Sequence, residues 1–232
     1  MIKFKIGNRL ISENEDPLII AEIGINHNGS LDSAISIVDS AIKAGAEIIK
    51  HQTHVVDDEM ANAAKKVIPG NSNKSIYQIV NEMALSEKDE KKLMNYVVNK
   101  KKIFFSSPFS RKAVDRLEKF GVPLYKIGSG ECNNYPFVEY ICKKKKPIIL
   151  STGMNSLKTI EPAVKIIRKY KLPYALLHCT NVYPTPHKLV RLNAMLELKK
   201  KFKDAIVGLS DHSKTIYTAL GAVSLGACII EK

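Results

Sequence analysis

The chain has 232 residues, of which 45% are apolar, and it carries a formal net charge of +13. This length and apolar content allow one sizeable core in one or two domains. No apolar run reaches the roughly 18 residues of a membrane span. The N-terminus also has no apolar segment before a small-residue cleavage site, so we expect no signal peptide. The four scattered cysteines are typical of buried thiols in a reducing compartment, and we expect a cytoplasmic protein.

The positive charge indicates a lysine-rich surface rather than a nucleic-acid interface. Only 5 of the 36 basic residues are arginine, which is the residue that bidentate recognition of phosphates and bases favours. The lysine runs at 100–102, 143–146 and 199–201 lie at or just after the ends of predicted helices, where cations complement the helix dipole. No aromatic residues interleave with them to stack bases. We therefore expect no nucleic-acid partner and no membrane partner.

Apolar, β-branched runs alternate with helical patterns along the whole chain. The predicted strands are 18–24, 47–53, 103–109, 124–129, 147–153, 174–180, 205–211 and 227–232, and clear helical periodicity covers 31–44, 112–120, 160–170 and 191–202. Continuous apolar strands between helices predict a parallel sheet buried on both faces. Eight of them favour an α/β fold of the (β/α)8 TIM-barrel type, formed by one domain over residues 1–232. A doubly wound open sheet is the alternative, but no GxGxxG follows the first strand.

Two features depart from the regular alternation. The connection 54–88 is long and contains the stretch IPGNSNKS, and a long connection after a strand is commonly a functional loop. The chain also ends at Lys232, inside or at the end of the eighth strand. A complete barrel needs a closing helix there, so we expect a barrel truncated at strand eight.

Polar residues gather at the C-terminal ends of all eight predicted strands, which is where a (β/α)8 barrel carries its chemistry. In chain order they are Glu22, Asn26, Lys50, Gln52, Ser106, Ser107, Lys126, Ser129, Ser151, Thr152, His178, Asn181, Tyr183, Ser210, Asp211, His212 and Glu231. Burying a lysine is costly unless the charge is paired. Two such lysines with several hydroxyls and an amide predict a site for a phosphate or a carboxylate.

Several of these residues keep a second interpretation. Lys126 could form the Schiff base of an aldolase. His27 could pack the turn after the first strand, and His178 could be a hydrogen-bonded core residue or a ligand. His51 and His54 flank Gln52 and are expected to face the helix layer or the rim. His212 follows Asp211 at a strand end, where a metal ligand is plausible.

Eight motifs in this order closely resemble the N-acetylneuraminate (sialic acid) synthase family, which includes siblings that make other nonulosonic acids. The motifs are AEIGINHNGS, KHQTH, IPGN, SSPFS, YKIGSGECNNYP, ILSTGMNS, LLHCTNVYPTP and GLSDHS. The resemblance extends from about residue 17 to the end of the chain. The stretches KHQTH, GSGECNNYP and LLHCTNVYPTP look most like the sialic acid branch.

The resemblance implies a condensation of phosphoenolpyruvate with N-acetylmannosamine, which gives N-acetylneuraminate and phosphate. Carbon 3 of phosphoenolpyruvate attacks the open-chain aldehyde, water adds at carbon 2, and phosphate leaves with cleavage of its C–O bond. A divalent metal, manganese or magnesium with cobalt as a further candidate, polarises the aldehyde oxygen. The partners are then phosphoenolpyruvate and an N-acetylated hexosamine.

The resemblance also assigns roles to the residues that match the motifs. The residues that would bind the phosphate and carboxylate of phosphoenolpyruvate are Lys50, Ser107, Lys126, Ser129, Ser151, Asn181 and Ser210. Gln52, Asn71 and Tyr183 would face the sugar, and His212 would be a metal ligand. Glu22 would lie by the metal and the aldehyde, either to transfer a proton or to orient the sugar. Glu22, Lys50 and Lys126 are thus the expected catalytic residues.

Two family features have no counterpart in this sequence. A second metal-binding histidine follows the strand-eight glutamate in the family, whereas this chain ends at Glu231 and Lys232. The family's C-terminal antifreeze-like domain, which lends an arginine to the partner's sugar site in a swapped homodimer, is also absent. We expect a homodimer of the full-length protein. A legionaminate or pseudaminate synthase and a truncated barrel that binds phosphoenolpyruvate without turnover remain the alternatives.

Overall fold

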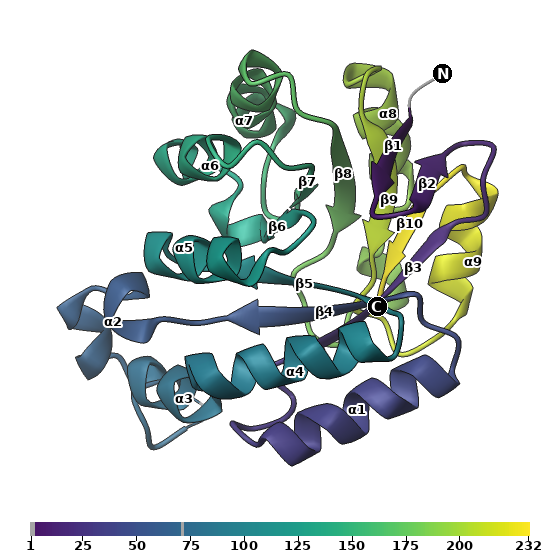
Figure 1. The fold of residues 1–232 in the computed structure, drawn as a ribbon. Helices are drawn as coiled ribbons and strands as arrows, with labels where there is room; N and C mark the ends of the chain where they lie inside the picture. The colour runs from purple at the N-terminus through teal and green to yellow at the C-terminus, as the bar shows by residue number, and fades with distance from the viewer. Residues whose placement is uncertain (1–2, 71) are drawn as a thin grey trace. The chain divides into compact units, whose positions relative to one another are not determined.

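The computed structural model describes residues 3–70 and 72–232 (Figure 1). The chain divides into two compact units, and each is described by itself. The first unit contains residues 1–21 and 123–232, and the second contains residues 22–122. The strand β3 (Leu18–Gly24) begins in the first unit and ends in the second.

All eight predicted strands are present. They are β3, β4 (Ile48–Thr53), β5 (Ile103–Pro108), β6 (Tyr125–Ile127), β7 (Ile148–Ser151), β8 (Tyr174–Cys179), β9 (Ile206–Ser210) and β10 (Ile229–Glu231). They form one sheet in the order β5-β4-β3-β10-β9-β8-β7-β6, and the pairings with a defined register are parallel. Sequential strands are neighbours and the first of the eight pairs with the last, so the order lacks the reversal of a doubly wound sheet. The predicted α/β fold of (β/α)8 type is confirmed.

The sheet of the first unit is strongly curled, as one ion pair within that unit shows. Lys126 Nζ on β6 lies 3.4 Å from Glu231 Oε1 on β10. The two strands are four places apart in the sheet order. In a flat sheet this would separate them by about 19 Å, which is more than the two side chains can span. The strands β6 to β10 therefore bend so that side chains from their ends converge.

The first unit also contains the helices that connect its strands. They are α6 (Tyr135–Cys142), α7 (Leu157–Lys169), α8 (Asn193–Lys201) and α9 (Tyr217–Ser224), with the short 3₁₀ helices η2 (Ser129–Glu131) and η3 (His187–Leu189). The helices α6 and α7 pack side by side (Figure 1). Ser156 accepts a hydrogen bond from Thr159 N–H at the start of α7, a local signal that fixes where this helix begins.

In the second unit, β4 pairs with β5 from Ile48 opposite Ile103 to Thr53 opposite Pro108. Its helices are α1 (Leu31–Lys43), α2 (Val56–Glu59), α3 (Ile76–Met83), α4 (Glu87–Asn99) and α5 (Arg111–Phe120), with the 3₁₀ helix η1 (Asn62–Lys66). The helices α1 and α4 lie side by side (Figure 1). The connection 54–88, expected as a long loop, contains α2, η1, α3 and the start of α4.

The sequence analysis missed an antiparallel hairpin at the N-terminus. It consists of β1 (Lys3–Ile6) and β2 (Arg9–Ser12). Each strand has only four residues, and lysines alternate with the buried Phe4 and Ile6 in β1, so no continuous apolar run marks it. The expectation of buried thiols is confirmed, because all four cysteines are free and buried. No helix among the described residues has the length and apolar character needed to cross a membrane.

Gly208 in β9 allows the close packing between neighbouring strands of this sheet to be tested. A Cβ atom at this position would overlap the carbonyl oxygen of Ile229 on the neighbouring β10, and this backbone cannot move without distorting the sheet. We expect Gly208→Ala to lower the free energy of unfolding by about 2 kcal/mol, measured by urea denaturation. The control is Gly130→Ala, whose Cβ would meet no atom within 4 Å. Equal stability of the two variants would contradict this account.

Candidate active site

The alternation of β4 separates two groups of polar residues in the second unit. Lys50 and Gln52 point to one face of the strand, whereas His51 and Thr53 point to the other. Ser107 on β5 is the register partner of Gln52 and shares its face. Lys50, Gln52 and Ser107, three of the predicted site residues, therefore share one face of β4 and β5.

Lys50 is buried and forms an ion pair with Glu22 at the end of β3. The pair involves Glu22 Oε2, and the other oxygen, Oε1, is buried with no hydrogen-bond partner in the part of the chain that the structure describes. The lysine is thus compensated by a carboxylate that keeps one oxygen available as an acceptor. The two predicted catalytic residues of this unit, Glu22 and Lys50, are in contact.

Lys126 is the centre of the corresponding cluster in the first unit. Its Nζ donates to Ser151 Oγ at 2.8 Å and pairs with Glu231, whose Oε1 also accepts from Ser210 Oγ at 2.9 Å. Cys179, Ser210 and Glu231 occupy the same register row across β8, β9 and β10. Three predicted residues, Lys126, Ser151 and Ser210, therefore gather around Glu231, a strand-end residue to which we had given no specific role.

Ser129 and Asn181 lie in the same unit, and both approach Gly153. Ser129 Oγ accepts from Gly153 N–H at 3.0 Å, and Asn181 Oδ1 accepts from the Cys179 thiol at 3.2 Å. A Cβ atom on Gly153 would overlap Asn181 Oδ1 and lie 2.9 Å from Ser129 Oγ. The sequence analysis did not select Gly153 or Cys179, because their importance depends on this close approach of three chain segments.

His212 has the environment of a neutral metal-binding histidine. Its Nδ1–H donates to the Thr180 carbonyl at 2.9 Å, which leaves the lone pair of Nε2 free to bind an ion. Burial lowers the pKa of His212 below its usual value, which favours the neutral ring. Tyr183 stacks on the ring with centroids 3.9 Å apart and is itself 71% exposed.

A complete metal site is not formed by the described residues. Among residues 3–70 and 72–232, no group of three His, Cys, Asp or Glu side chains is arranged to hold an ion. His212 therefore fits as one ligand and needs further ligands. Asn71, which was expected to face the sugar, lies outside the described residues.

The remaining histidines have structural partners. His178 is buried, and its Nε2–H donates to the Val190 carbonyl at 2.7 Å, which is the core interpretation. His51 faces the helix layer, as expected, and contacts Glu90 of α4. His54 lies between Glu59 and Gln52.

His27 and His51 belong to a buried chain of hydrogen bonds with one direction. Gly29 N–H donates to His27 Nδ1 at 3.2 Å, so the His27 proton is on Nε2 and is donated to His51 Nε2 at 3.1 Å. His51 Nδ1–H then donates to Glu90 Oε1 at 3.2 Å. The turn after β3 is thereby tied to the back of β4 and to α4, which supports the packing interpretation of His27.

Glu90 is the acceptor at the end of this chain. It also accepts from the Thr53 hydroxyl and from Arg116, whose Nη1 lies 3.1 Å away. Burial alone would raise the pKa of Glu90, but the hydrogen bonds from His51 and Thr53 and the Arg116 charge bring it below its usual value. Glu90 is thus a charged residue that three neighbouring side chains orient, those of His51, Thr53 and Arg116.

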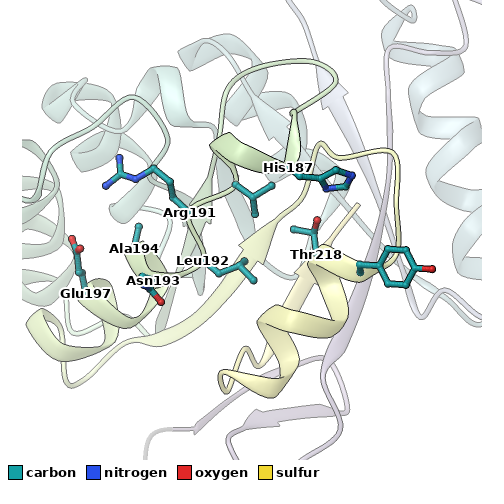
Figure 2. A pocket seen from close by; sticks show the side chains of 9 residues that line it. His187, Arg191, Leu192, Asn193, Ala194, Glu197 and Thr218 are labelled. Carbon is teal, nitrogen blue, oxygen red and sulfur yellow. The ribbon is translucent and has the colours of Figure 1, made fainter.

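Two cavities lie in the first unit beside the predicted residues. One, of about 610 Å³, is lined by the turn after β7 and reaches Gly153, Cys179 and Asn181. The other, of about 670 Å³, lies between the start of α8 and the start of α9, where His187, Arg191 and Tyr217 line it (Figure 2). Both are large enough for a small ligand, but only the first includes a predicted site residue.

The fold and these clusters define a parallel α/β protein whose strand ends present buried, carboxylate-paired lysines with hydroxyls and a neutral imidazole. A model of the NeuB family matches residues 37–232, and the chain belongs to this family.

Several named proteins are similar to this chain. It is 40% identical over 222 residues to the N,N'-diacetyllegionaminic acid synthase of Campylobacter jejuni. The aligned region covers 93% of this chain and 66% of that protein. It is 32% identical over 218 residues to the human N-acetylneuraminate-9-phosphate synthase, with 92% of this chain and 60% of that protein covered. The crystal structure of the sialic acid synthetase of Leptospira borgpetersenii superposes with a TM-score of 0.89 at 34% identity, covering 99% of this chain and 77% of that one. The chain spans about two thirds of the length of the curated relatives it matches.

The His27 environment predicts a pH-dependent stability. Burial and the neighbouring His51 lower the pKa of His27 from 6.5 to about 4. The unfolded chain binds this proton near pH 6.5, whereas the folded chain binds it only near pH 4. The free energy of unfolding should therefore fall as the pH drops from about 6.5 to 4, by up to about 3 kcal/mol.

Urea denaturation at several pH values measures this slope. We expect His27→Gln to be less stable at pH 7 but to lose much of the slope between pH 6.5 and 4. The exposed His187→Gln is the matched control and should keep the slope of the unaltered chain. A His27→Gln variant with an unchanged slope would show that His27 does not cause the effect.

Proposed function

We propose that this chain carries the catalytic part of a synthase that condenses phosphoenolpyruvate with an N-acetylated hexosamine to a nonulosonic acid. The observation that carries the proposal is the pair of buried lysines, Lys50 and Lys126, at strand ends of a NeuB family member. The relatives named above are synthases of such acids. The exposed lysines elsewhere on the chain lack this burial and this constellation of hydroxyls.

In the first unit, we assign the binding of phosphoenolpyruvate oxygens to the Lys126 cluster. The Lys126 ammonium and the hydroxyls of Ser151, Ser210 and Ser129 are donors that suit phosphate or carboxylate oxygens, and the amide of Asn181 adds a further polar group. Tyr183 offers an exposed ring and hydroxyl to the sugar. The Glu231 carboxylate already pairs with Lys126, so it holds the ammonium in place before the substrate arrives.

In the second unit, Lys50 and Ser107 are assigned to phosphoenolpyruvate, and Gln52 and Glu22 to the sugar. The partner-free Glu22 Oε1 is an acceptor for a sugar hydroxyl or for a proton released during the reaction. Carbon 3 of phosphoenolpyruvate attacks the aldehyde carbon, water adds at carbon 2, and the C–O bond to phosphate breaks. The lysines neutralise the negative charge that gathers on the phosphate as it leaves.

The proposal includes a divalent metal ion, for which the chain offers His212 as a ligand. His212 would be one ligand of a manganese or magnesium ion, or of cobalt. When bound, such an ion would polarise the aldehyde oxygen. We also propose that the full-length protein is a homodimer that acts in the cytoplasm.

N-acetylmannosamine is the sugar that we propose first, because the motifs at KHQTH, GSGECNNYP and LLHCTNVYPTP resemble the sialic acid branch. One observation favours a second candidate. The legionaminic acid synthase of Campylobacter jejuni is 40% identical, compared with 32% for the human N-acetylneuraminate-9-phosphate synthase. A 6-deoxy, diacetylated hexosamine is therefore the second candidate.

Phosphate release from phosphoenolpyruvate tests the reaction. We expect release by the 232-residue chain with manganese only when an accepted sugar is present, and we expect a chelator to abolish it. N-acetylmannosamine and the diacetylated sugar should be compared at equal concentration, since the ratio of kcat/KM values identifies the substrate. Binding of phosphoenolpyruvate without release for any sugar would contradict the synthase and support the binding alternative. A borohydride-trapped adduct on Lys126 would instead indicate an aldolase.

The two buried lysines should each contribute to phosphoenolpyruvate affinity. We expect Lys50→Ala and Lys126→Ala to weaken binding by more than the about 1 kcal/mol of an exposed ion pair, which is at least about fivefold in Kd by calorimetry. The control is Lys112→Ala, which removes a mostly exposed lysine near Asp58.

Folding must be monitored, because removing Lys126 takes away the ammonium that pairs with the buried Glu231. The double variant Lys126→Ala/Glu231→Gln relieves this charge and should be more stable than Lys126→Ala. Unchanged affinity in both single lysine variants would refute their assignment to phosphoenolpyruvate.

A further inference from the structure

His54 ends the KHQTH motif and has no assigned role, although its contacts lead directly to a predicted sugar-facing residue. Its side chain is only 5% exposed, and its ring stacks on Phe109 with centroids 4.5 Å apart and an angle of 9° between the ring planes. One ring nitrogen faces α2 and the other faces Gln52. The stacking fixes the plane of the ring, so the two nitrogens have defined directions.

Both ring nitrogens donate to oxygen atoms. Nδ1–H donates to Glu59 Oε2 at 2.8 Å, and Nε2–H donates to Gln52 Oε1 at 3.3 Å. The Glu59 side chain, which is 11% exposed, holds the ring from the side of α2. Glu59, His54 and Gln52 thus form a relay from α2 to the end of β4.

The relay decides which end of the Gln52 amide faces the site. With Oε1 held by His54, the amide nitrogen lies at the opposite end, toward Gly24. Gly24 has no side chain, and two polar atoms approach the position that a Cβ atom would occupy there. Such a Cβ would lie 3.5 Å from Gln52 Nε2 and 3.1 Å from Glu22 Oε1. An N–H donor and a carboxylate acceptor therefore lie side by side.

A donor beside an acceptor is suited to a hydroxyl group, which both accepts and donates. Gln52 Nε2–H would donate to the hydroxyl oxygen, and the hydroxyl proton would be donated to Glu22 Oε1. That oxygen is buried and has no partner within the described part of the chain, so it gains a hydrogen bond when a hydroxyl binds.

We infer that His54, held by Glu59, is a positioning residue that orients the Gln52 amide as a donor, so that Gln52 and Glu22 together bind one hydroxyl of the sugar. This inference rests on the proposed function for the identity of the ligand as a sugar. The orientation of Gln52 by His54 is independent of that identity. His54 itself does not contact the substrate.

Steady-state kinetics with phosphate release separates positioning from a general structural role. His54→Phe keeps an aromatic ring to stack on Phe109 and removes both donors. We expect the KM for the sugar to rise about tenfold, with the KM for phosphoenolpyruvate changed less than twofold. His54→Gln restores one N–H donor where Nε2 stood and should recover most of the sugar KM. Glu59→Gln removes the carboxylate that accepts from Nδ1–H and should raise the sugar KM about threefold.

The matched control is Tyr77→Phe. It removes a hydrogen bond of 2.7 Å from Tyr77 to Asp57, which anchors the same helix α2 without touching His54. We expect its sugar KM to be unchanged. If Tyr77→Phe and His54→Phe raise both KM values equally, the order of α2 explains the effect and the inference is overturned.

A second measurement does not depend on turnover. In the ¹⁵N NMR spectrum of the imidazole side chains, Nε2 of His54 should carry the proton that it donates to Gln52, and the Gln52 side-chain amide signals should shift in His54→Phe. An unprotonated Nε2 in the unaltered chain would mean that Gln52 turns its NH2 toward His54, which overturns the inference. If no sugar supports turnover, the proposed function fails, while this spectrum still decides the role of His54.

Discussion

Burying two lysine ammonium groups within strands of the sheet is the constraint on which the rest of the structure depends. Removing such an ion from water costs several kcal/mol, and only a close carboxylate and further hydrogen bonds offset it. Lys50 has Glu22, and Lys126 has Glu231 together with Ser151. The Lys126 pair also requires the curled sheet of the first unit, because its members lie on strands four places apart. The pair can form only if that curvature is present.

The two faces of β4 show how one strand combines chemistry with rigidity. Lys50 and Gln52 are on the face that carries the polar strand ends, whereas His51 and Thr53 on the opposite face converge on Glu90 of α4. A network in which each donor has one acceptor has no alternative arrangement of similar energy. His27 connects this network to the turn after β3, the strand that bears Glu22. The residues behind the strand therefore restrict the movement of those in front of it.

Much of this arrangement could be predicted from the sequence, because its signals are local. Each predicted strand is a continuous apolar run, and the position of Lys50 or Lys126 at the end of such a run needs no tertiary information. The alternation within KHQTH also indicates that Lys50 and Gln52 share a face. The hairpin of β1 and β2 escaped prediction because four-residue strands with alternating lysines lack that signal.

The partners of the predicted residues could not be obtained in the same way. That Glu231 pairs with Lys126 depends on the curvature of five strands, and that Gly153 must be glycine depends on where Asn181 and Ser129 approach it. His54 was expected to face the helix layer or the rim, but its contacts with Glu59 and Phe109 arise only when α2 and the end of β5 fold beside it. The local sequence pattern therefore identifies which residues are candidates for the site, whereas their contact partners are known only from the packing of the folded chain.

The paired state of the lysines has a consequence for the kind of ligand that they select. Without a substrate, Lys126 is already neutralised by Glu231, so a ligand with a single weak charge gains little by competing for the ammonium. A phosphate carries more charge and more acceptor oxygens than one carboxylate, so it can share Lys126 with Glu231 and also accept from Ser151 and Ser210. The Glu231 carboxylate therefore stabilises the folded chain and also raises the negative charge that a ligand needs in order to bind Lys126.

The same logic applies to Lys50 and Glu22, where the carboxylate that balances the lysine also keeps an acceptor oxygen for a neutral hydroxyl. The way in which these lysines are buried therefore favours a highly charged ligand at Lys126 and a neutral hydroxyl at Glu22.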